Sequence, residues 1–295
     1  MLSILIPTKD YDCHLLIEEL HKQGEVLGVP FEILVAEDGT ETGLIHLNSI
    51  ADNLEHCRRI VKKENIGRAA IRNLLANEAQ YCNLIFIDCD AVAERNGFLK
   101  DYLDALKTSN VVCGGLYHAD ELPDRYCTLR YKYEKKADKL RDAATRNKAP
   151  YDKFTTFNFA IKKTIFTSIL FDTAITGYGY EDALFGKELE KRNIRITHID
   201  NPLLHNGLEE NAIFLTKTEQ ALNNLVAIRE KIGSTPLTVA AEKLDSCHFT
   251  WLFMLYWRGC RNCLRKNLLG NHPSLWNFNI YKLGYYISLV ENSKK

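Results

Sequence analysis

Two aspartates, Asp88 and Asp90, stand one residue apart directly after the short apolar run at residues 84–87. A continuous apolar run of this length predicts a strand buried on both faces, which places the two carboxylates at the end of that strand. Two acids at such a position need a counter-charge, and Mg²⁺ or Mn²⁺ is a cation that carboxylate oxygens prefer. The pair therefore indicates a divalent metal site, with two loop-capping aspartates as the alternative.

The segments around this pair alternate between two kinds of pattern. Apolar runs predict strands at residues 2–7, 31–36, 59–61, 84–87 and 111–116. Helical spacing predicts helices at residues 15–23, 67–79 and 97–106. This alternation is typical of a mostly parallel sheet covered by helices on both faces, where ligands bind outside the carboxyl ends of the strands.

Polar residues follow three of the predicted strands. The strand ends read Pro7-Thr8-Lys9, Glu37-Asp38-Gly39 and Asp88-Cys89-Asp90, and we expect them to line one crevice. The helix at residues 67–79 begins beside them, where Gly67 permits close backbone approach and the helix-start amides favour an anion. Arg72 on this helix is expected to pair with a diphosphate, with Asp38 or with Asp88; the alternative is an ordinary surface cation.

Four segments, in this order and spacing, resemble family 2 glycosyltransferases of the GT-A fold. They are residues 3–8 (SILIPT), 37–39 (EDG), 65–73 (NIGRAAIRN) and 87–90 (IDCD), and the resemblance covers roughly residues 1–210. It implies a nucleotide-sugar donor site that contains Pro7, Thr8, Asp38, Arg72, Asp88 and Cys89.

Within that site, the resemblance assigns separate roles. Asp38 reads the uracil edge and so suggests a UDP donor, Arg72 lies beside the base and the diphosphate, and Asp88 faces the ribose and the donor sugar. Asp90 is implied as the ligand of Mn²⁺ or Mg²⁺. Glu37 stands where a smaller or polar residue is expected, which affects the fine geometry only.

A second acid pair lies in the segment Tyr178-Gly179-Tyr180-Glu181-Asp182. This segment resembles the Gly-Trp-Gly-x-Glu-Asp motif of β-1,4-galactosyltransferases and chondroitin-type polymerases. The resemblance implies that Asp182 is the base for the acceptor hydroxyl, with Glu181 beside it, and that Tyr178 and Tyr180 face the acceptor. Tyr178 replaces the usual tryptophan, so the sugar-stacking platform is expected to be smaller. The alternative is helix capping by the two acids, which the helix dipole favours in any case.

Two further residues receive roles from the resemblance. His205 follows a probable strand and is implied as an additional metal ligand, although a lone histidine is also common as a structural residue. Asn158, in the strand predicted at residues 157–161, is expected to point toward the acceptor, with a strand-end backbone hydrogen bond as the alternative. The family resemblance also implies inversion at the anomeric carbon.

The alternating pattern predicts an α/β domain, and the resemblance implies that it is a GT-A (Rossmann-like) catalytic domain, at residues 1–233. A helical C-terminal extension is expected at residues 234–295. Helices are expected at residues 122–146, 181–191 and 209–231, and extended segments at residues 194–204. The stretch Gly233-Ser234-Thr235-Pro236 is the expected linker.

The C-terminal extension begins with the apolar, aromatic run at residues 249–257. Arg258, Arg261, Arg265 and Lys266 follow it. Aromatic residues beside cations are typical of helices that lie on an anionic membrane surface, so association of residues 249–266 with a membrane is one interpretation. The family resemblance suits it, because many bacterial relatives use lipid-linked acceptors. The alternative is a helical subdomain packed on the core or on a second subunit.

Composition narrows the function classes. Lys and Arg together number 38, as do Asp and Glu, so the formal net charge is zero and no nucleic-acid partner is expected. No apolar run reaches the ~18 residues that cross a bilayer, and the N-terminal run is too short for a signal peptide. We therefore expect a cytoplasmic protein with its nine cysteines as buried thiols. A peripheral location on the inner face of the cell membrane follows only if residues 249–266 bind membrane. The pair Cys260 and Cys263 alone is weak evidence for zinc or redox chemistry.

These observations predict an inverting glycosyltransferase that moves a sugar from a UDP-type donor to a glycan or lipid-linked acceptor, in surface polysaccharide or glycoconjugate synthesis. One alternative is a catalytically silent nucleotide-sugar-binding or scaffold protein, which need not keep both Asp90 and Asp182. Another is a nucleotidyltransferase, which would want a glycine-rich loop after the first strand, whereas residues 7–12 contain no glycine.

Overall fold

The computed structural model describes residues 1–122, 124–175 and 177–293. Contacts divide the chain into two compact units, which we describe separately. The first unit comprises residues 1–119, 138–175 and 181–207, and the second comprises residues 120–137, 176–180 and 208–295. The domain boundary expected at Gly233 stays a prediction.

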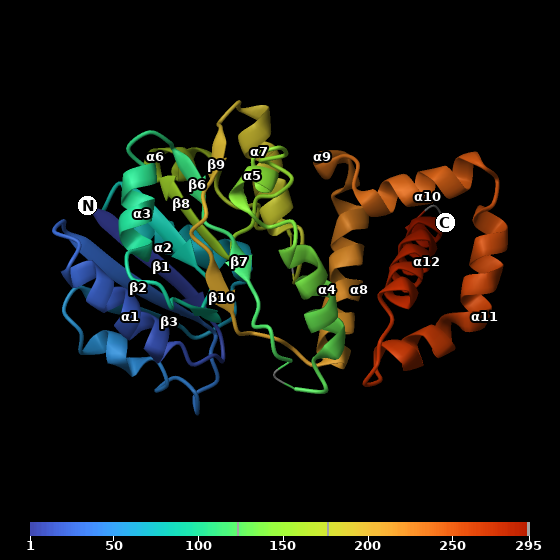
Figure 1. The fold of residues 1–295 in the computed structure, drawn as a ribbon, viewed down its shortest axis with the longest axis horizontal. Helices are drawn as coiled ribbons and strands as arrows, with labels where there is room; N and C mark the ends of the chain where they lie inside the picture. Colours follow the sequence, from blue (N-terminus) through green and yellow to red (C-terminus); the bar gives the residue numbers. More distant parts are fainter. Residues whose placement is uncertain (123, 176, 294–295) are drawn as a thin grey trace. The chain divides into compact units, whose positions relative to one another are not determined.

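The first unit is built on a seven-stranded sheet with the strand order β3-β2-β1-β4-β8-β6-β9 (Figure 1). Its strands are β1 (Leu2–Thr8), β2 (Phe31–Asp38), β3 (Cys57–Lys62), β4 (Asn83–Ile87), β6 (Val111–Cys113), β8 (Asn158–Lys162) and β9 (Ile196–His198). Only β8 runs antiparallel to its neighbours β4 and β6. A smaller sheet joins β5 (Ala91–Val92), β10 (Leu203–His205) and β7 (Leu116–Tyr117). The predicted mostly parallel α/β fold is confirmed.

Helices cover both faces of the large sheet because the side chains of each strand alternate between them. In β1, Leu2, Ile4 and Ile6 join one core together with α1 (His14–Glu25) and α3 (Phe98–Ala105). Leu5 joins the opposite core with α2 (Arg68–Glu78), α6 (Lys163–Ile169) and α7 (Glu181–Lys191). The same alternation holds in β4, where Ile85 and Ile87 face the first core and Leu84 and Phe86 face the second.

The strand expected at residues 111–116 is wrong in one respect, because it divides into β6 and β7, which belong to different sheets. The break falls at Gly114 and Gly115. Gly115 has a φ of +90°, a backbone conformation that L side chains rarely adopt. A Cβ at Gly114 would overlap with the Asn201 carbonyl oxygen and the Tyr102 hydroxyl.

Two long helices predicted from composition are also interrupted. The segment 122–146 contains α4 (Thr128–Asp138) and the short α5 (Ala143–Arg146), and its Pro123 lies outside the described residues. The segment 209–231 forms α8 (Asn211–Ala227) and α9 (Arg229–Ile232). The polar composition of these segments predicted helix correctly but contained no signal strong enough to mark the breaks.

The second unit is helical, and most of it is α8, α10 (Pro236–Ser246), α11 (Thr250–Leu268) and α12 (Leu275–Ser293). Thr235 caps α10 through a capping box, and Pro236 occupies the first turn, where a proline costs no hydrogen bond. Helices α11 and α12 lie side by side (Figure 1), and Gly284 lets the Trp257 ring approach the α12 backbone. Among the described residues, no helix is long and apolar enough to cross a membrane.

All nine cysteines lie in described segments, and each is a free thiol. Most are buried or half-buried, as expected for thiols. Cys82, Cys247 and Cys263 are exposed, so the expectation of buried thiols is wrong for these three.

A buried arginine fastens the end of β6 to the end of β9. The Arg146 guanidinium donates to the carbonyl oxygens of Cys113 (3.1 Å), Gly114 (3.1 Å) and Ile199 (2.8 Å), and the side chain is only 4% exposed. Burial, and after it the Arg146 charge, lowers the pKa of His198 to about 4. His198 is therefore neutral at pH 7, and its Nδ1 accepts from Arg146 at 2.8 Å.

Replacing Arg146 with methionine is expected to lower the free energy of unfolding by about 3 kcal/mol, because buried carbonyl oxygens lose their donors. Urea denaturation measures this difference. Arg192→Met is the control, since Arg192 is exposed and donates to the single carbonyl oxygen of Ser168, and its effect should stay within about 0.5 kcal/mol. Equal losses in the two variants would contradict the structural role of Arg146.

Candidate functional site

The candidate site lies where the strand order of the large sheet reverses. The chain builds β1, β2 and β3 outward in one direction and then returns to place β4 on the other side of β1. Ligands of open α/β sheets bind at this switch point, outside the carboxyl ends of the strands. Thr8 ends β1, Asp38 ends β2 and Asp88 follows β4, so the residues expected to meet at one edge do so.

An arginine on α2 connects the two acid pairs that the sequence singled out. Arg68 Nε donates to Glu181 Oε1 at 2.8 Å, and an Arg68 terminal nitrogen lies 3.5 Å from Asp88 Oδ2. Arg72, one helical turn further along, donates to Asp88 Oδ1 at 2.6 Å. Residues 68, 88 and 181 are far apart in the sequence, yet their charged groups form one continuous network.

The structure changes the expected role of Arg72 and adds Arg68. Arg72 is 1% exposed beneath Asp88, so of its expected partners it takes Asp88 and lies too deep for a diphosphate outside the strand ends. Arg68 has a side chain that is 41% exposed and carries the outward-facing charge. The sequence interpretation missed Arg68. The two arginines are spaced i, i+4 and share one helix face, which is the sequence signal that could have pointed to it.

The two carboxyl groups of the second pair have opposite pKa shifts. Burial opposes ionisation of Glu181, but the Arg68 and Arg72 charges outweigh it and hold the pKa of Glu181 below its usual value. Burial, and next the negative charge of Glu181, raise the pKa of Asp182 to about 6. Asp182 Oδ1 also accepts the Ala183 backbone N–H at 2.7 Å, at the start of α7. One carboxylate is thus fixed as an anion while its neighbour titrates near neutral pH, which suits a general base.

Asp90 and His205 are neighbours at one end of the small sheet, where Asp90 precedes β5 and His205 ends β10. His205 Nε2 lies 3.0 Å from Asp90 Oδ2, and the Asn206 backbone N–H donates to the Asp90 carbonyl oxygen at 2.9 Å. Gly207 makes this approach possible, because a Cβ there would overlap with the Asp90 carboxylate. The strand end at 203–207 therefore holds the Asp90 carboxylate against the imidazole.

Oxygen and imidazole nitrogen are a donor set that suits Mn²⁺ and, less well, Mg²⁺. Within the described residues, no group of three or more His, Cys, Asp or Glu side chains is arranged to hold a metal ion. Asp90 and His205 make two ligands, and cations of this class commonly complete their shell with waters and substrate phosphates. The pair fits such an ion.

The other residues expected at the donor site lie at the same edge. Asp38 accepts the backbone N–H groups of Ile66 (2.7 Å) and Gly67 (3.0 Å), which fixes the turn that starts α2. Thr8 is 3% exposed and donates to the Tyr11 carbonyl oxygen, and Pro7 is half-buried beside it. These contacts give Asp38 and Thr8 structural functions, and their contact with a nucleoside stays a prediction.

The surroundings of Cys89 and Glu37 give neither residue a direct role in catalysis. Burial, and then the neighbouring Asp90 charge, raise the pKa of the Cys89 thiol to about 12, so it is no nucleophile at neutral pH. Glu37 has no exposed surface, and its carboxylate accepts from Thr40 (2.6 Å) and Asn48 (2.9 Å). Glu37 thereby anchors the loop after β2, which explains an acid at this position.

The structure gives Asn158 partners that leave nothing for an acceptor. Its side chain has no exposed surface, accepts from the Tyr102 hydroxyl and donates to the carbonyl oxygens of Gly115 and Asn201, both at 3.0 Å. Asn158 closes the break between β6 and β7, as the strand-end alternative supposed. We leave it out of the acceptor site.

Tyr178 and Tyr180 belong to the second unit. The Lys217 ammonium lies over the Tyr178 ring, 5.1 Å from its centroid, and Tyr180 has a φ of +71°. Thr176, at the start of this loop, lies outside the described residues. The acceptor role of the two tyrosines stays a prediction.

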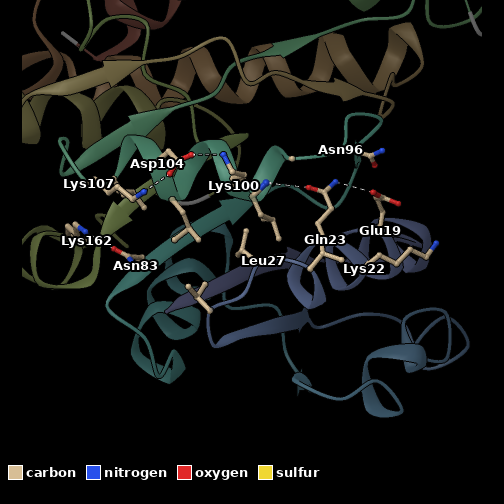
Figure 2. Close-up of a pocket in the computed structure, with 16 residues that line it drawn as sticks. Glu19, Lys22, Gln23, Leu27, Asn83, Asn96, Lys100, Asp104, Lys107 and Lys162 are labelled. Carbon is tan, nitrogen blue, oxygen red and sulfur yellow. Dashed lines mark hydrogen bonds and ion pairs between the residues drawn. The ribbon is translucent and has the colours of Figure 1, made fainter.

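A large pocket of about 810 Å³ lies elsewhere on the first unit, between α1 and α3 (Figure 2). Its lining includes Glu19, Lys22, Gln23, Leu27, Lys100, Asp104 and Lys107. Asn83, at the amino end of β4, and Lys162 also line the pocket. About 16 Å of strand separates Asn83 from Asp88, which follows the carboxyl end of β4. Lys100 and Lys107 both pair with Asp104 (Figure 2), and the pocket has no titratable group with a role in the site above.

The sequence model described as "Glycosyl transferase family 2" matches residues 3–169, more than half of the chain. The chain belongs to glycosyltransferase family 2. The matched segment contains Thr8, Asp38, Arg68, Asp88 and Asp90. No curated protein matches the sequence.

Solved structures of glycosyltransferases resemble this family 2 member at low sequence identity. A mannosyltransferase from Pyrobaculum calidifontis, in complex with GDP-Man and Mn²⁺, matches with a TM-score of 0.59 and 14% identity over 100% of this chain and 88% of that one. Glucosyl-3-phosphoglycerate synthase from Mycobacterium tuberculosis, in complex with Mn²⁺, UDP-glucose and phosphoglyceric acid, matches with a TM-score of 0.52 and 14% identity over 77% and 79%. TarS from S. aureus, in complex with UDP, matches with a TM-score of 0.50 and 16% identity over 76% and 65%. These likenesses establish a GT-A-like fold.

Proposed function

We propose that this family 2 glycosyltransferase moves a sugar, with inversion and with the help of a divalent metal, from a UDP-type donor to an acceptor hydroxyl. The observation that carries the proposal is Arg68, which contacts Asp88 at the donor-side strand end and Glu181 at the acid pair. Arg68 thereby joins Asp88, at the proposed nucleotide-sugar site, to Glu181, the chain neighbour of the proposed base Asp182. Sugar transfer requires the donor site and the base to lie close together.

The donor would bind across the carboxyl ends of β1, β2 and β4. Thr8 and Asp38 would contact the nucleoside, and Asp88, held by Arg72 and Arg68, would face the ribose and the sugar. Three neighbours of the same fold were solved with GDP-Man, UDP-glucose or UDP, which supports a nucleoside-diphosphate donor at this position.

Asp90 and His205 would hold Mn²⁺ or Mg²⁺. The ion would offset the negative charge that grows on the departing diphosphate. Two neighbours were solved with Mn²⁺, which supports manganese among the candidates. Arg68, which has a 41% exposed side chain and contacts Asp88, would contribute a further positive charge at the donor site.

Asp182 would accept the proton of the acceptor hydroxyl as its oxygen attacks the anomeric carbon. Glu181 would remain an anion because Arg68 is bound to it, and its charge adds to burial in raising the pKa of Asp182 to about 6. The segment 178–182 resembles the acceptor motif of galactosyltransferases and chondroitin-type polymerases, so we propose that Tyr178 and Tyr180 line the acceptor side. A glycan or a lipid-linked saccharide of a surface polysaccharide or glycoconjugate is the proposed acceptor class.

Gly207→Ala tests the Asp90 geometry without removing a polar group. The new Cβ must displace the Asp90 carboxylate, so we expect Mn²⁺-dependent donor binding to weaken by about tenfold or more. Gly43→Ala is the matched control, since a Cβ there meets nothing and its backbone has no positive φ. Isothermal titration with UDP and Mn²⁺ measures both, and equal affinity in the two variants would contradict the proposed arrangement.

We also propose that α11 rests on an anionic membrane surface. One face of α11 packs on the second unit through Met254, Trp257, Leu264 and Leu268. The opposite face exposes Trp251, Leu252, Leu255 and Tyr256, and exposed cations follow on the same helix. An apolar face beside cations is the pattern of an interfacial helix.

Trp251→Ser is expected to lower the binding of the full chain to vesicles that contain phosphatidylglycerol by about tenfold, because a large apolar side chain no longer enters the interface. Trp276→Ser is the matched control: the two tryptophans are 68% and 63% exposed, but Trp276 lies on α12. Vesicle co-sedimentation measures both. Equal binding of wild type and Trp251→Ser would remove the membrane role of α11.

A screen of donor hydrolysis tests the proposed activity as a whole. The chain is incubated with UDP- and GDP-sugars in the presence of Mn²⁺, Mg²⁺ or EDTA, and nucleoside diphosphate release is measured. We expect release from a UDP-sugar that depends on the metal. Binding of a donor without release from any donor would favour the alternative of a catalytically silent nucleotide-sugar-binding or scaffold protein. Release only from GDP-sugars would contradict the uracil-reading role of Asp38.

A further inference from the structure

Two polar side chains without a role so far, His118 and Asp138, lie in line with His205. His118 follows β7 and is 2% exposed, and Asp138 is the last residue of α4. His118 Nε2 lies 2.9 Å from His205 Nδ1, and His118 Nδ1 lies 3.1 Å from Asp138 Oδ1. Since His205 Nε2 is 3.0 Å from Asp90, the four side chains form one hydrogen-bonded row.

The row is held rigidly by its surroundings. The His118 and His205 rings meet edge-to-face, with centroids 5.0 Å apart and planes at 90°. Phe157 contacts His205 in the same manner, at 5.0 Å and 89°. Asp138 Oδ2 accepts the His118 backbone N–H at 3.1 Å, and Arg141 donates to Asp138 Oδ1 at 2.5 Å.

A cation on His205 Nε2 leaves one consistent arrangement of protons. The metal needs the lone pair of Nε2, so the proton of neutral His205 must be on Nδ1. Nδ1 then donates to His118 Nε2, which places the single proton of neutral His118 on its Nδ1. That proton is donated to the Asp138 carboxylate. Arg141 Nη1 lies 3.4 Å from the same nitrogen, and in this arrangement it donates to Asp138 Oδ1 and not to His118.

We propose that His118 and Asp138 are positioning residues of the divalent cation site, which fix the Nδ1-protonated tautomer and the ring orientation of His205. The inference rests on the metal site proposed above. Carboxylates and other acceptors behind a metal-bound histidine commonly act this way, and their loss typically costs 10–100-fold in metal affinity. Here a second imidazole stands between the carboxylate and the ligand, so the effect extends over two hydrogen bonds.

Titration of the full chain with Mn²⁺, followed by electron paramagnetic resonance of the free ion, tests the inference. We expect His118→Phe to weaken Mn²⁺ binding by about 10–100-fold, because phenylalanine fills the space but accepts no hydrogen bond. We expect His118→Gln to restore much of the affinity, since its amide oxygen can accept from His205 Nδ1. His272→Phe, at an exposed histidine of the second unit, is the control and should bind as wild type does.

A tautomer measurement separates positioning from simple packing. At a Mg²⁺ concentration that saturates the wild type, the ¹⁵N shifts of His205 should show a protonated Nδ1 in wild type and in His118→Gln. In His118→Phe at the same concentration, much of the ion is lost and His205 should show a mixture of tautomers. Asp138→Asn should also weaken Mn²⁺ binding, and it remains informative if His118→Phe does not fold.

The outcomes distinguish the two proposals. Wild-type Mn²⁺ affinity in folded His118→Phe, or in Asp138→Asn, overturns the positioning role while loss of binding in Asp90→Ala upholds the metal site. Wild-type Mn²⁺ affinity in Asp90→Ala and His205→Ala overturns the metal site itself, and the positioning role with it.

Discussion

Asp182→Asn should lower the rate of sugar transfer by about 10²–10⁴-fold and leave donor affinity nearly unchanged. Asparagine keeps the shape of the side chain but cannot accept a proton from the acceptor hydroxyl. Steady-state transfer assays give the rate, and titration with UDP and Mn²⁺ gives donor affinity. Normal turnover of this variant would contradict the assignment of Asp182 as the base, and lost donor binding would show that it acts elsewhere.

The raised pKa of Asp182 should also make the rate of sugar transfer depend on pH. At pH values below about 6, Asp182 is increasingly protonated and cannot take a proton, so kcat should fall about tenfold per pH unit there and level off above. Glu181→Gln removes the negative neighbour that raises this pKa, which should move the acid limb of the profile to lower pH. An acid limb that stays in place in Glu181→Gln would contradict the coupling of the two carboxyls.

Asp90→Ala should abolish the metal-dependent part of donor binding. In wild type, we expect UDP to bind about tenfold or more tightly with Mn²⁺ than with EDTA, because the ion joins the diphosphate to the protein. In Asp90→Ala, the two affinities should become equal. Isothermal titration under both conditions measures the difference.

Asp88→Asn is the matched control for this experiment, since it changes the other carboxylate of the same loop. Asp88 is bound to Arg72 and Arg68, so its loss should reduce turnover while the difference between Mn²⁺ and EDTA persists. If Asp88→Asn removed the metal dependence and Asp90→Ala kept it, the roles of the two aspartates would be exchanged.

The sheet could be predicted because each strand is marked by a short run of neighbouring residues in the sequence. The alternation of core side chains in β1 and β4 follows from short apolar runs, and polar strand ends mark the carboxyl edge where Asp38 and Asp88 lie. The break at Gly115 was not predictable, since a positive φ leaves no mark in hydropathy and the two halves join different sheets.

The site was only partly predictable because several of its contacts are long-range. Arg72 was found through its motif, but its burial under Asp88 and the bridge from Arg68 to Glu181 depend on how α7 packs beside α2. His118 had no signal at all: it stands 87 residues from His205, in a segment that resembles no motif. Asn158 was misassigned because a strand-end amide looks the same whether it faces a ligand or closes a gap in the backbone.

We propose that one nucleoside diphosphate and one divalent ion bind at Asp90, close to Asp88 and to the Arg68 side chain that contacts it. An anomalous difference map from crystals grown with UDP and Mn²⁺ tests it most directly. We expect one strong manganese peak about 2.1 Å from an Asp90 carboxylate oxygen and close to His205 Nε2, with the UDP diphosphate beside it. Bound UDP with no manganese peak at Asp90, or UDP in the pocket between α1 and α3, would contradict it.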